Sequence, residues 1–119
     1  MAVIPAYEAP KWLLVVLNSL YEAERKLSLH GDAGNVMRNL ERIKETLKNE
    51  GGVFFEDPMG EAFSETRTDL EATISGETAE DLVVVEVIKP IVRFGNEDLS
   101  RVVQRGIVVV KAQTKGELK

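Results

Sequence analysis

The chain has 119 residues, of which 44% are hydrophobic and 29% charged, and its formal net charge is −5. This length suits one domain, or one small domain with an appendage, and the composition argues against a wholly disordered chain. Cysteine is absent and histidine occurs once, which excludes disulfides, thiolate metal sites and histidine-rich zinc sites.

The acidic balance disfavours nucleic acid as a partner, because nonspecific binding to phosphates needs a basic face. A membrane is not expected either. The longest apolar run, residues 12–17, is far shorter than the roughly 20 residues that a bilayer span needs. No basic region precedes an apolar stretch near residue 1, so no secretory signal is visible. We therefore expect a cytoplasmic protein.

Residues 1–52 read as a helical hairpin. Pro10 suits the start of a first helix, Asp32 or Asn35 can cap a second, and Gly51-Gly52 can end it. Apolar residues recur in both helices at spacings of three and four, the period of one helical face. We expect a dimeric four-helix bundle, because two such faces need a further helical pair to cover them. The residues expected at this dimer seam are Leu13, Val16, Leu17, Leu20, Leu27, Met37, Leu40, Ile43 and Leu47.

The alternative is that the helices pack on strands of the same chain. Trp12, Tyr21 and Met37 are expected in a core or at the dimer seam rather than in a ligand cage.

Residues 53–113 are rich in strand signals. The segments 82–88 and 107–112 are dense in β-branched residues, and 68–75 alternates between apolar and polar residues. Pro90 should end a strand, and residues 95–98, Gly-Asn-Glu-Asp, should form a turn. We expect a small antiparallel β domain of about four to six short strands, followed by a frayed tail at 114–119. The fold class is thus α+β.

Acidic residues near the predicted domain boundary offer two candidate sites. Glu56, Asp57 and Glu61 could supply carboxylate oxygens to a hard divalent cation, although their spacing matches no calcium loop, and a solvated loop is the alternative. Glu65 and Asp69 would form an acid–base pair only if one strand carried both, so we expect surface charge. The pattern favours no metal, no cofactor and no catalytic residue, and we expect no enzymatic activity.

Basic residues recur on the predicted late strands, at Lys89, Arg93, Arg101, Arg105 and Lys111. On one alternating strand, Arg101 and Arg105 would share a face. Such charges either protect strand edges from aggregation or form a protein-docking surface, where arginine is enriched. The pattern leaves both interpretations open.

Six short motifs follow one another along residues 13–112. The first three are Leu13-Leu-Val-Val-Leu-Asn-Ser-Leu-Tyr-Glu-Ala23, Leu47-Lys-Asn-Glu-Gly-Gly-Val53 and Asp57-Pro-Met-Gly-Glu-Ala-Phe63. The last three are Leu70-Glu-Ala-Thr73, Val84-Val-Glu-Val87 and Arg101-Val-Val-Gln-Arg-Gly-Ile-Val-Val-Val110. In order and spacing this series resembles the GrpE family, the nucleotide exchange factors of DnaK-type chaperones.

The resemblance implies a helical pair that dimerises into a four-helix bundle, followed by a compact β domain. It implies a homodimeric co-chaperone that binds the ATPase domain of a DnaK-type chaperone and promotes ADP release in protein folding and the stress response. The docking residues that we expect on this basis are Arg93, Phe94, Arg101, Gln104, Arg105 and Ile107.

The chain also departs from the family pattern. The family's closing arginine falls on Gln104, and its Gln-Lys-Gly-Tyr turn reads Lys89-Pro90-Ile91-Val92. These residues contain no counterpart of the long coiled-coil helix that precedes the bundle in typical members. A GrpE-derived structural or adaptor dimer, which binds another protein and has no exchange activity, is therefore the second hypothesis. A third is a small enzyme or metal-binding protein that uses the acids of residues 50–81, and it predicts a thermal shift with a divalent cation.

Overall fold

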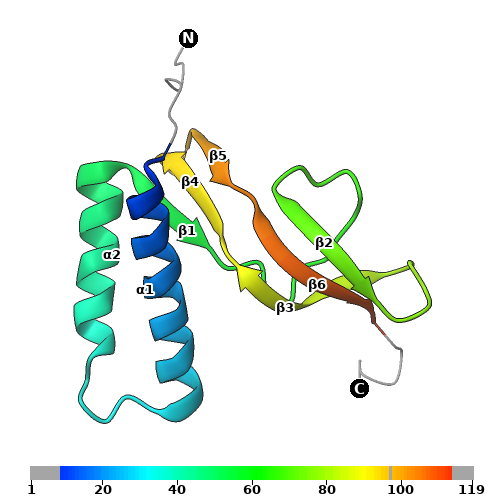
Figure 1. Cartoon of the computed structure of the whole chain (residues 1–119), viewed down its shortest axis with the longest axis horizontal. Coiled ribbons are helices and arrows are strands. Elements are labelled where there is room, and N and C mark those ends of the chain that lie inside the picture. The colour runs from blue at the N-terminus through cyan, green and yellow to red at the C-terminus, as the bar shows by residue number, and fades with distance from the viewer. Residues whose placement is uncertain (1–8, 97, 114–119) are drawn as a thin grey trace. The chain divides into compact units, whose positions relative to one another are not determined.

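A computed structural model describes residues 9–96 and 98–113 (Figure 1). In this part of the chain, two helices are followed by six strands, which gives the α+β class that the sequence predicts. The elements are α1 (Lys11–His30), α2 (Met37–Gly51), β1 (Val53–Glu56), β2 (Leu70–Ser75), β3 (Leu82–Lys89), β4 (Ile91–Gly95), β5 (Ser100–Gln104) and β6 (Gly106–Ala112). The strands form two three-stranded sheets, in the orders β1-β4-β5 and β2-β6-β3.

Helix α1 begins directly after Pro10. The Pro10 carbonyl oxygen accepts hydrogen bonds from the backbone N–H groups of Leu13 at 3.0 Å and Leu14 at 3.3 Å. Proline fits this end of a helix, because an N–H there would have no intrahelical partner. The helix ends at His30, and the N–H of Gly31 then donates to the carbonyl oxygen of Leu27 at 2.8 Å.

Asp32 caps the start of α2. Its carboxylate accepts hydrogen bonds from the backbone N–H groups of Val36 at 2.6 Å and Met37 at 2.8 Å. These bonds satisfy donors that the beginning of a helix leaves unpaired. At the other end, Gly52 adopts the left-handed conformation with φ of 67°, and its N–H donates back to the last turn. Both predicted signals are confirmed, with Asp32 rather than Asn35 as the capping residue.

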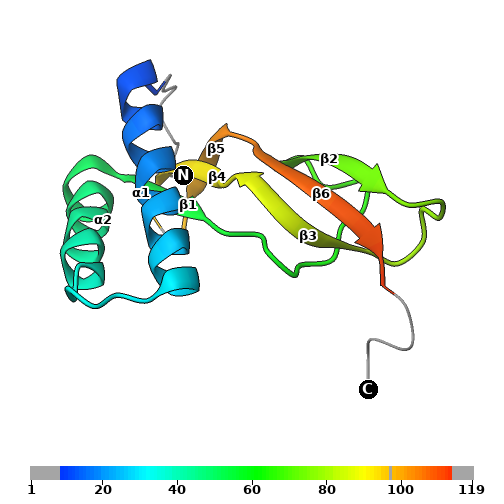
Figure 2. The same cartoon turned by 60° about the horizontal axis from the view of Figure 1, so that its bottom comes forward.

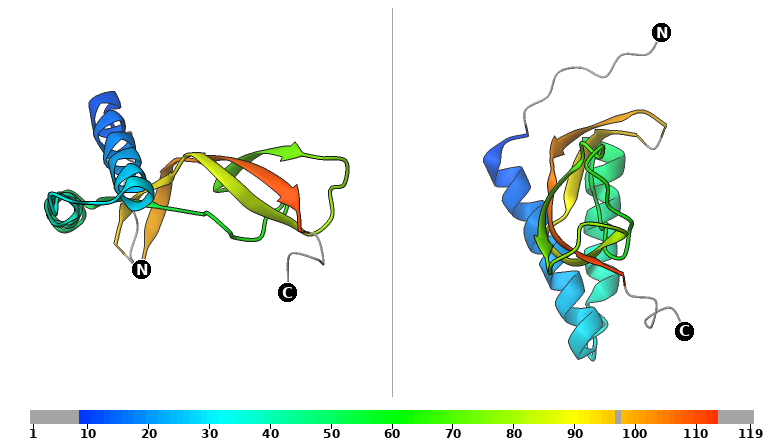
Figure 3. Two further views of the ribbon diagram at one scale, coloured as in Figure 1. Left: turned by 90° about the horizontal axis from the view of Figure 1, so that it is seen from below. Right: turned by 90° about the vertical axis from the view of Figure 1, so that its right-hand side faces the viewer.

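The chain divides into two compact units, and unit 1 holds the helices together with β1 and most of β4 and β5, residues up to 56 and 92–103. Figure 3 shows α1 tilted relative to α2, which one panel views along its axis. The rings of Tyr21 in α1 and Phe55 in β1 pack edge to face, with centroids 5.7 Å apart and planes at 86°. The buried core cluster of this unit consists of Leu13, Leu17, Val53 and Val92.

Leu13, Leu17 and Leu20, which the sequence analysis assigned to a seam between copies, are all buried within the protomer. Leu13 and Leu17 lie on the face of α1 that packs on Val53 and Val92. In this unit the helices therefore pack on strands of the same chain, which was the alternative left open. Tyr21 is likewise a core residue.

Unit 2 holds residues 57–91 and those from 104 onward, and its sheet has β6 in the middle (Figure 2). Strand β2 pairs with β6 in parallel, from Leu70 opposite Gly106 to Ser75 opposite Lys111. The prediction of a wholly antiparallel β domain is wrong at this pair. Parallel strands need a long crossover, and three other strands separate β2 from β6 along the chain.

Strand β3 lies on the other side of β6 and pairs with it antiparallel. The register shifts between Val84 and Glu86 and again between Val87 and Lys89, so β3 carries two bulges or irregularities. Pro90 separates β3 from β4, as the sequence predicts. The buried apolar residues of unit 2 are Leu70, Leu82, Val84, Val87, Ile91, Val108 and Val110.

These units differ from the ranges 1–52 and 53–113 that the sequence suggests. The reason is the sheet β1-β4-β5, which associates β1 and the β4–β5 hairpin with the helices. The residue composition changes along the sequence near residue 52, but such a change does not show which distant strands share a sheet. The tail 114–119 and Glu97 of the predicted turn lie outside the described residues.

Two glycines occupy positions where a side chain would collide with its surroundings. Gly95, at the start of the β4–β5 turn, has φ of 135°, and a Cβ there would overlap the carbonyl oxygen of Leu99. In unit 2, a Cβ on Gly106 would lie 2.8 Å from Leu70 Cδ2 and 3.0 Å from Ile91 Cγ1. The β2–β6 pair therefore depends on a residue without a side chain at the start of β6.

Candidate protein-docking surfaces

The sheet of unit 2 has one buried face and one more exposed face. Val108 and Val110 of β6 are fully buried, whereas Ile107 and Val109, which point to the opposite side, are half-buried, and Lys111 is exposed. Alternate residues of a strand point to opposite faces, so these three side chains share a face. We call the face of the sheet that carries them the outer face.

The strand register gives the rest of the outer face as three rows across β2, β6 and β3. The rows are Glu71–Ile107–Lys89, Thr73–Val109–Glu86 and Ser75–Lys111–Val83. The centre of the face is thus apolar and its margin is polar and charged, an arrangement typical of protein-docking surfaces.

The two register shifts of β3 determine which of its side chains belong to the outer face. Strict alternation from Val83 would place Val85 and Val87 beside it, but Glu86 pairs with Val109, and Val87 is buried. The sequence analysis therefore missed Glu86 and also Val109. The only sequence signal for Val109 is its position two residues after Ile107 in a β-branched run.

Three of the six expected docking residues lie in unit 2. Ile107 lies on the outer face, as described above. Arg105 donates from Nη2 to the carbonyl oxygen of Leu70 at 2.6 Å, and its Nη1 lies 3.6 Å from Glu71 Oε1. Gln104 donates from Nε2 to the carbonyl oxygen of Pro90 at 3.0 Å. The polar groups of Gln104 and Arg105 thus already have partners within the unit.

The other three expected docking residues lie in unit 1. Arg93 of β4 forms an ion pair with Glu56 of β1, with Nε and Oε1 2.6 Å apart. Phe94 is half-buried against the core cluster, and Arg101 of β5 is exposed. The expectation that Arg101 and Arg105 share a face of one strand is wrong, because β5 ends at Gln104 and β6 begins at Gly106.

Apolar side chains also remain exposed on the helices of unit 1. Trp12 and Val16 of α1 are 66% and 38% exposed, and Ile43 of α2 is 44% exposed. At about 100° per residue, Trp12 and Val16 lie about 180° and 140° around α1 from Tyr21, which contacts Phe55 of β1. Trp12 therefore points away from β1, whereas Val16 lies about 60° around α1 from the buried Leu13 and flanks the packed face.

Ile43 flanks the packed face of the second helix. It lies about 40° around α2 from Leu47, which packs against the core cluster. Although its apolar stripe repeats at helical spacing, α2 contains no buried residue. We call these exposed apolar side chains, Trp12, Val16 and Ile43, the open helix face. Trp12 was expected in a core or a seam, and its exposure places it outside the protomer core.

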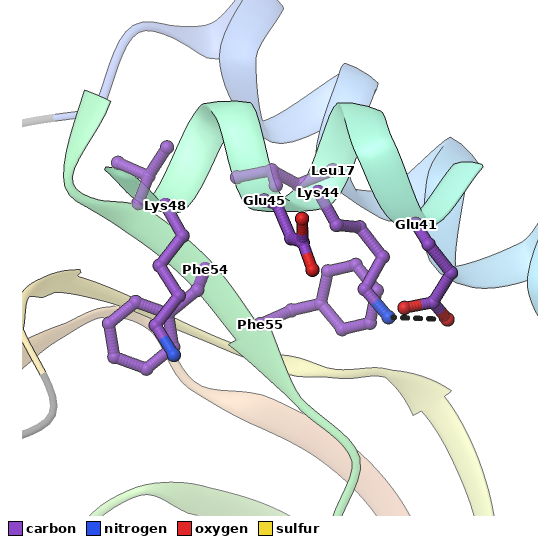
Figure 4. Close-up of a pocket in the computed structure, with 8 residues that line it drawn as sticks. Leu17, Glu41, Lys44, Glu45, Lys48, Phe54 and Phe55 are labelled. Atoms are coloured by element: carbon purple, nitrogen blue, oxygen red, sulfur yellow. Dashed lines mark ion pairs between the residues drawn. The ribbon is translucent and has the colours of Figure 1, made fainter. Parts of the chain in front are cut away.

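A small pocket of about 220 Å³ opens between α2 and β1 (Figure 4). Lys44 and Lys48 extend over the rings of Phe55 and Phe54, with Nζ-to-centroid distances of 5.0 Å and 5.4 Å. Lys44 also forms an ion pair of 2.9 Å with Glu24 of α1. The lining residues are Leu17, Glu41, Lys44, Glu45, Lys48, Val53, Phe54 and Phe55. Two lysines and two glutamates balance at this site, so its charge selects neither anions nor cations.

Each of the three candidate cation ligands binds a different partner within the chain. Glu56 pairs with Arg93, and Asp57 accepts a hydrogen bond from the backbone N–H of Met59 at 3.0 Å. Glu61 pairs with Arg67 at 3.0 Å. Among the described residues, no group of three or more metal-ligating side chains comes together.

The candidate carboxylate pair is not formed on a strand. Strand β2 begins at Leu70, so neither Glu65 nor Asp69 belongs to it. Asp69 binds Arg67 through both oxygens, at 3.0 Å and 2.9 Å, while Glu65 is exposed. Arg67 also donates to the carbonyl oxygen of Ala62 at 3.1 Å. The Arg67 guanidinium thus links three groups of the loop before β2 and stabilises its conformation.

Within the described ranges, no helix has the length and apolarity that a membrane crossing requires. Comparisons of the chain with protein-family models, with curated proteins and with solved structures find no match.

Proposed function

We propose that this chain is a GrpE-like co-chaperone, a cytoplasmic homodimer that promotes ADP release from a DnaK-type chaperone and catalyses no reaction itself. The proposal rests on the resemblance of the six sequence motifs. It is supported by the order of the elements, because a helical pair precedes six short strands. The chaperone's ATPase domain is the proposed partner, and the late strands are the proposed docking region.

The observation that carries the homodimer is the open helix face. Trp12, Val16 and Ile43 remain exposed on the two helices, and α2 has no buried residue. Exposed apolar groups on neighbouring helices lose contact with water when a second helical pair covers them, at about 25 cal/mol per Å². A four-helix bundle between two copies would cover this face. The proposed seam therefore moves from Leu13, Leu17 and Leu20 to the open helix face.

The proposed mechanism is differential binding. A partner that binds the open form of the ATPase cleft more tightly than the closed form shifts the population toward the open form. ADP then leaves faster, although this protein contributes no reacting group. The outer face of unit 2, with its apolar centre and charged margin, is a surface suited to such binding. In unit 1, the exposed Arg101 is a separate candidate.

The test is stopped-flow release of a fluorescent ADP analogue from a DnaK-type chaperone of the same organism, with and without this protein. We expect faster release with the wild-type chain. Arg101→Glu should abolish chaperone binding and leave the dimer intact, whereas Arg42→Glu, on an exposed residue of α2, is the matched charge-reversal control. Unchanged binding of Arg101→Glu would exclude Arg101 from the docking region, and no acceleration by a confirmed dimer would exclude the exchange function.

A second candidate is a GrpE-derived adaptor dimer without exchange activity. One observation favours it: Gln104 occupies the position of the family's closing arginine and binds the carbonyl oxygen of Pro90. The next residue, Arg105, binds Leu70 and Glu71 of its own unit. An adaptor of this kind would dimerise and bind a protein partner but leave ADP release unchanged, so the same measurement separates the two functions.

A further inference from the structure

The two outer strands of the unit 2 sheet are protected to different degrees. The edge of β3 is covered by the segment 60–63: Gly60 donates to the carbonyl oxygen of Val84 at 3.0 Å, and Val84 donates back to Glu61 at 2.9 Å. Phe63 also donates to the carbonyl oxygen of Leu82, at 2.9 Å. Bulges and covering segments of this kind are devices that keep an edge strand from pairing with another chain.

The other edge, formed by β2, has a backbone pattern that can be derived residue by residue. The carbonyl oxygen of Asp69 accepts a hydrogen bond from Gly106 at 2.9 Å, so Asp69 faces β6. In an extended strand, the N–H and C=O of successive residues point alternately to the two sides. Glu71 and Thr73 therefore bond to β6, whereas Ala72 and Ile74 direct their backbone groups to the free edge.

This edge carries none of the protective features of β3. Arg105 covers the carbonyl oxygen of Leu70, but among the described residues no bond reaches the backbone groups of Ala72 and Ile74 from the free side. Strand β2 contains no proline and no lysine. The side chain of Ile74 is 42% exposed, so the buried face of the sheet is incompletely covered there.

Unit 2 is acidic overall. Its described residues include nine acidic and four basic residues. Glu77, two residues after the end of β2, is exposed, and the segment between β2 and β3 contains no lysine or arginine. A strand that added to this edge would therefore be favoured by basic side chains and opposed by acidic ones.

We propose that the free edge of β2 binds a basic, extended segment of a partner protein by β-strand addition. The backbone groups of Ala72 and Ile74 pair with the added strand. An apolar side chain of that strand covers Ile74, and a lysine or arginine of that strand lies near Glu77. This surface is independent of the proposed exchange function and of the open helix face.

The test uses two probe peptides with blocked ends, one alternating lysine with valine and one alternating glutamate with valine. In NMR titrations of the full chain, the lysine peptide should shift the amide signals of Ala72 and Ile74 and slow their hydrogen exchange. At low salt it should bind at least about tenfold more tightly than the glutamate peptide. Equal binding of the two peptides, or shifts confined to other strands, would overturn the proposal.

Variants at Ile74 test the backbone contact. Ile74→Pro removes an N–H that points away from β6, so it should abolish binding of the lysine peptide and preserve the protected β6 amides. Ile74→Thr keeps that N–H and should retain most of the affinity. Ile74→Lys should leave the fold intact and weaken binding of the lysine peptide, because it adds a positive charge at the edge. This variant provides the test if Ile74→Pro does not fold.

A second copy of this chain is the competing occupant of the edge. In that case the Ala72 and Ile74 signals of the wild-type chain would depend on protein concentration without any peptide. Ile74→Pro would remove this dependence while a dimer through the helices persisted. That result would assign the edge to β2–β2 pairing between copies and overturn the basic-peptide proposal.

Discussion

The Nη2 atom of Arg105 donates a hydrogen bond to the backbone carbonyl oxygen of Leu70 at 2.6 Å, and this bond joins the linker between β5 and β6 to the first residue of β2. The Nη1 atom of the same guanidinium lies 3.6 Å from Glu71 Oε1. A parallel strand pair has no tight turn that fixes its register. Arg105 supplies a side-chain contact at the end where the β2–β6 pair begins.

Replacing Arg105 should therefore loosen the β2–β6 pair. We expect Arg105→Gln to lower the free energy of unfolding by about 1–2 kcal/mol, as for the loss of a hydrogen bond from a charged donor at a partly exposed site. Urea denaturation measures this change. The exposed Arg42 of α2 is the control, and Arg42→Gln should change the midpoint little. Equal effects of the two variants would show that the contact with Leu70 contributes no stability.

Gly106 should not tolerate a methyl group. Gly106→Ala places a Cβ 2.8 Å from Leu70 Cδ2 and 3.0 Å from Ile91 Cγ1, so two buried side chains must move. We expect a loss of about 1–3 kcal/mol, the usual cost of overpacking a core. Gly34→Ala is the matched control, because its nearest neighbour would be Val36 Cγ2 at 3.5 Å. A loss for Gly106→Ala no greater than for Gly34→Ala would contradict this packing.

The local signals of the sequence predicted the ends of the elements well. The Asp32 cap, the helix end at Gly52 and the break at Pro90 each depend on the conformational preference of one residue and its immediate neighbours. Such signals act over a few residues, so a single sequence contains them in full.

What the sequence did not predict is the pairing of distant segments. The parallel β2–β6 pair and the sheet β1-β4-β5 depend on packing between segments far apart in the chain. For the same reason the sequence analysis named only Ile107, Lys89 and Lys111 of the outer face. The bulge beside Glu86 changes which residues of β3 point outward, and nothing in the alternation of β3 indicates it.

The stabilisation that Arg67 provides should be independent of pH from neutrality to pH 10. The hydrogen bond with Asp69 is the main cause that raises the pKa of the Arg67 guanidinium above its ordinary value; partial burial opposes it, and Glu61 adds to it. A raised folded-state pKa gives stability that is complete below the unfolded-state pKa and is lost only as pH rises through the folded-state value. For arginine that window lies above about pH 12.

The measurement compares urea midpoints of the wild-type chain and Arg67→Gln at pH 7 and at pH 10. We expect Arg67→Gln to cost about 1–3 kcal/mol, because it removes a charged donor that three loop groups share. The difference between the two proteins should be equal at both pH values. A difference that shrinks at pH 10 would mean that another titrating group, rather than the Arg67 guanidinium, controls the stability of this loop.

The open helix face should decide the oligomeric state. Val16 and Ile43 are exposed in the protomer, so a double change to Val16→Glu and Ile43→Glu removes apolar contact area and adds charge without disturbing the core cluster. Burial of one such side chain contributes about 1.5–3 kcal/mol, and a twofold seam contains each side chain twice. We therefore expect the dissociation constant of the dimer to rise at least about 100-fold. Sedimentation velocity measures this change, with circular dichroism as the check on helix content.

Leu29→Glu is the matched control, because Leu29 is 71% exposed but lies about 140° around α1 from Val16. A wild-type chain that sediments as a monomer, or a double variant that remains dimeric, would contradict a seam on the open helix face.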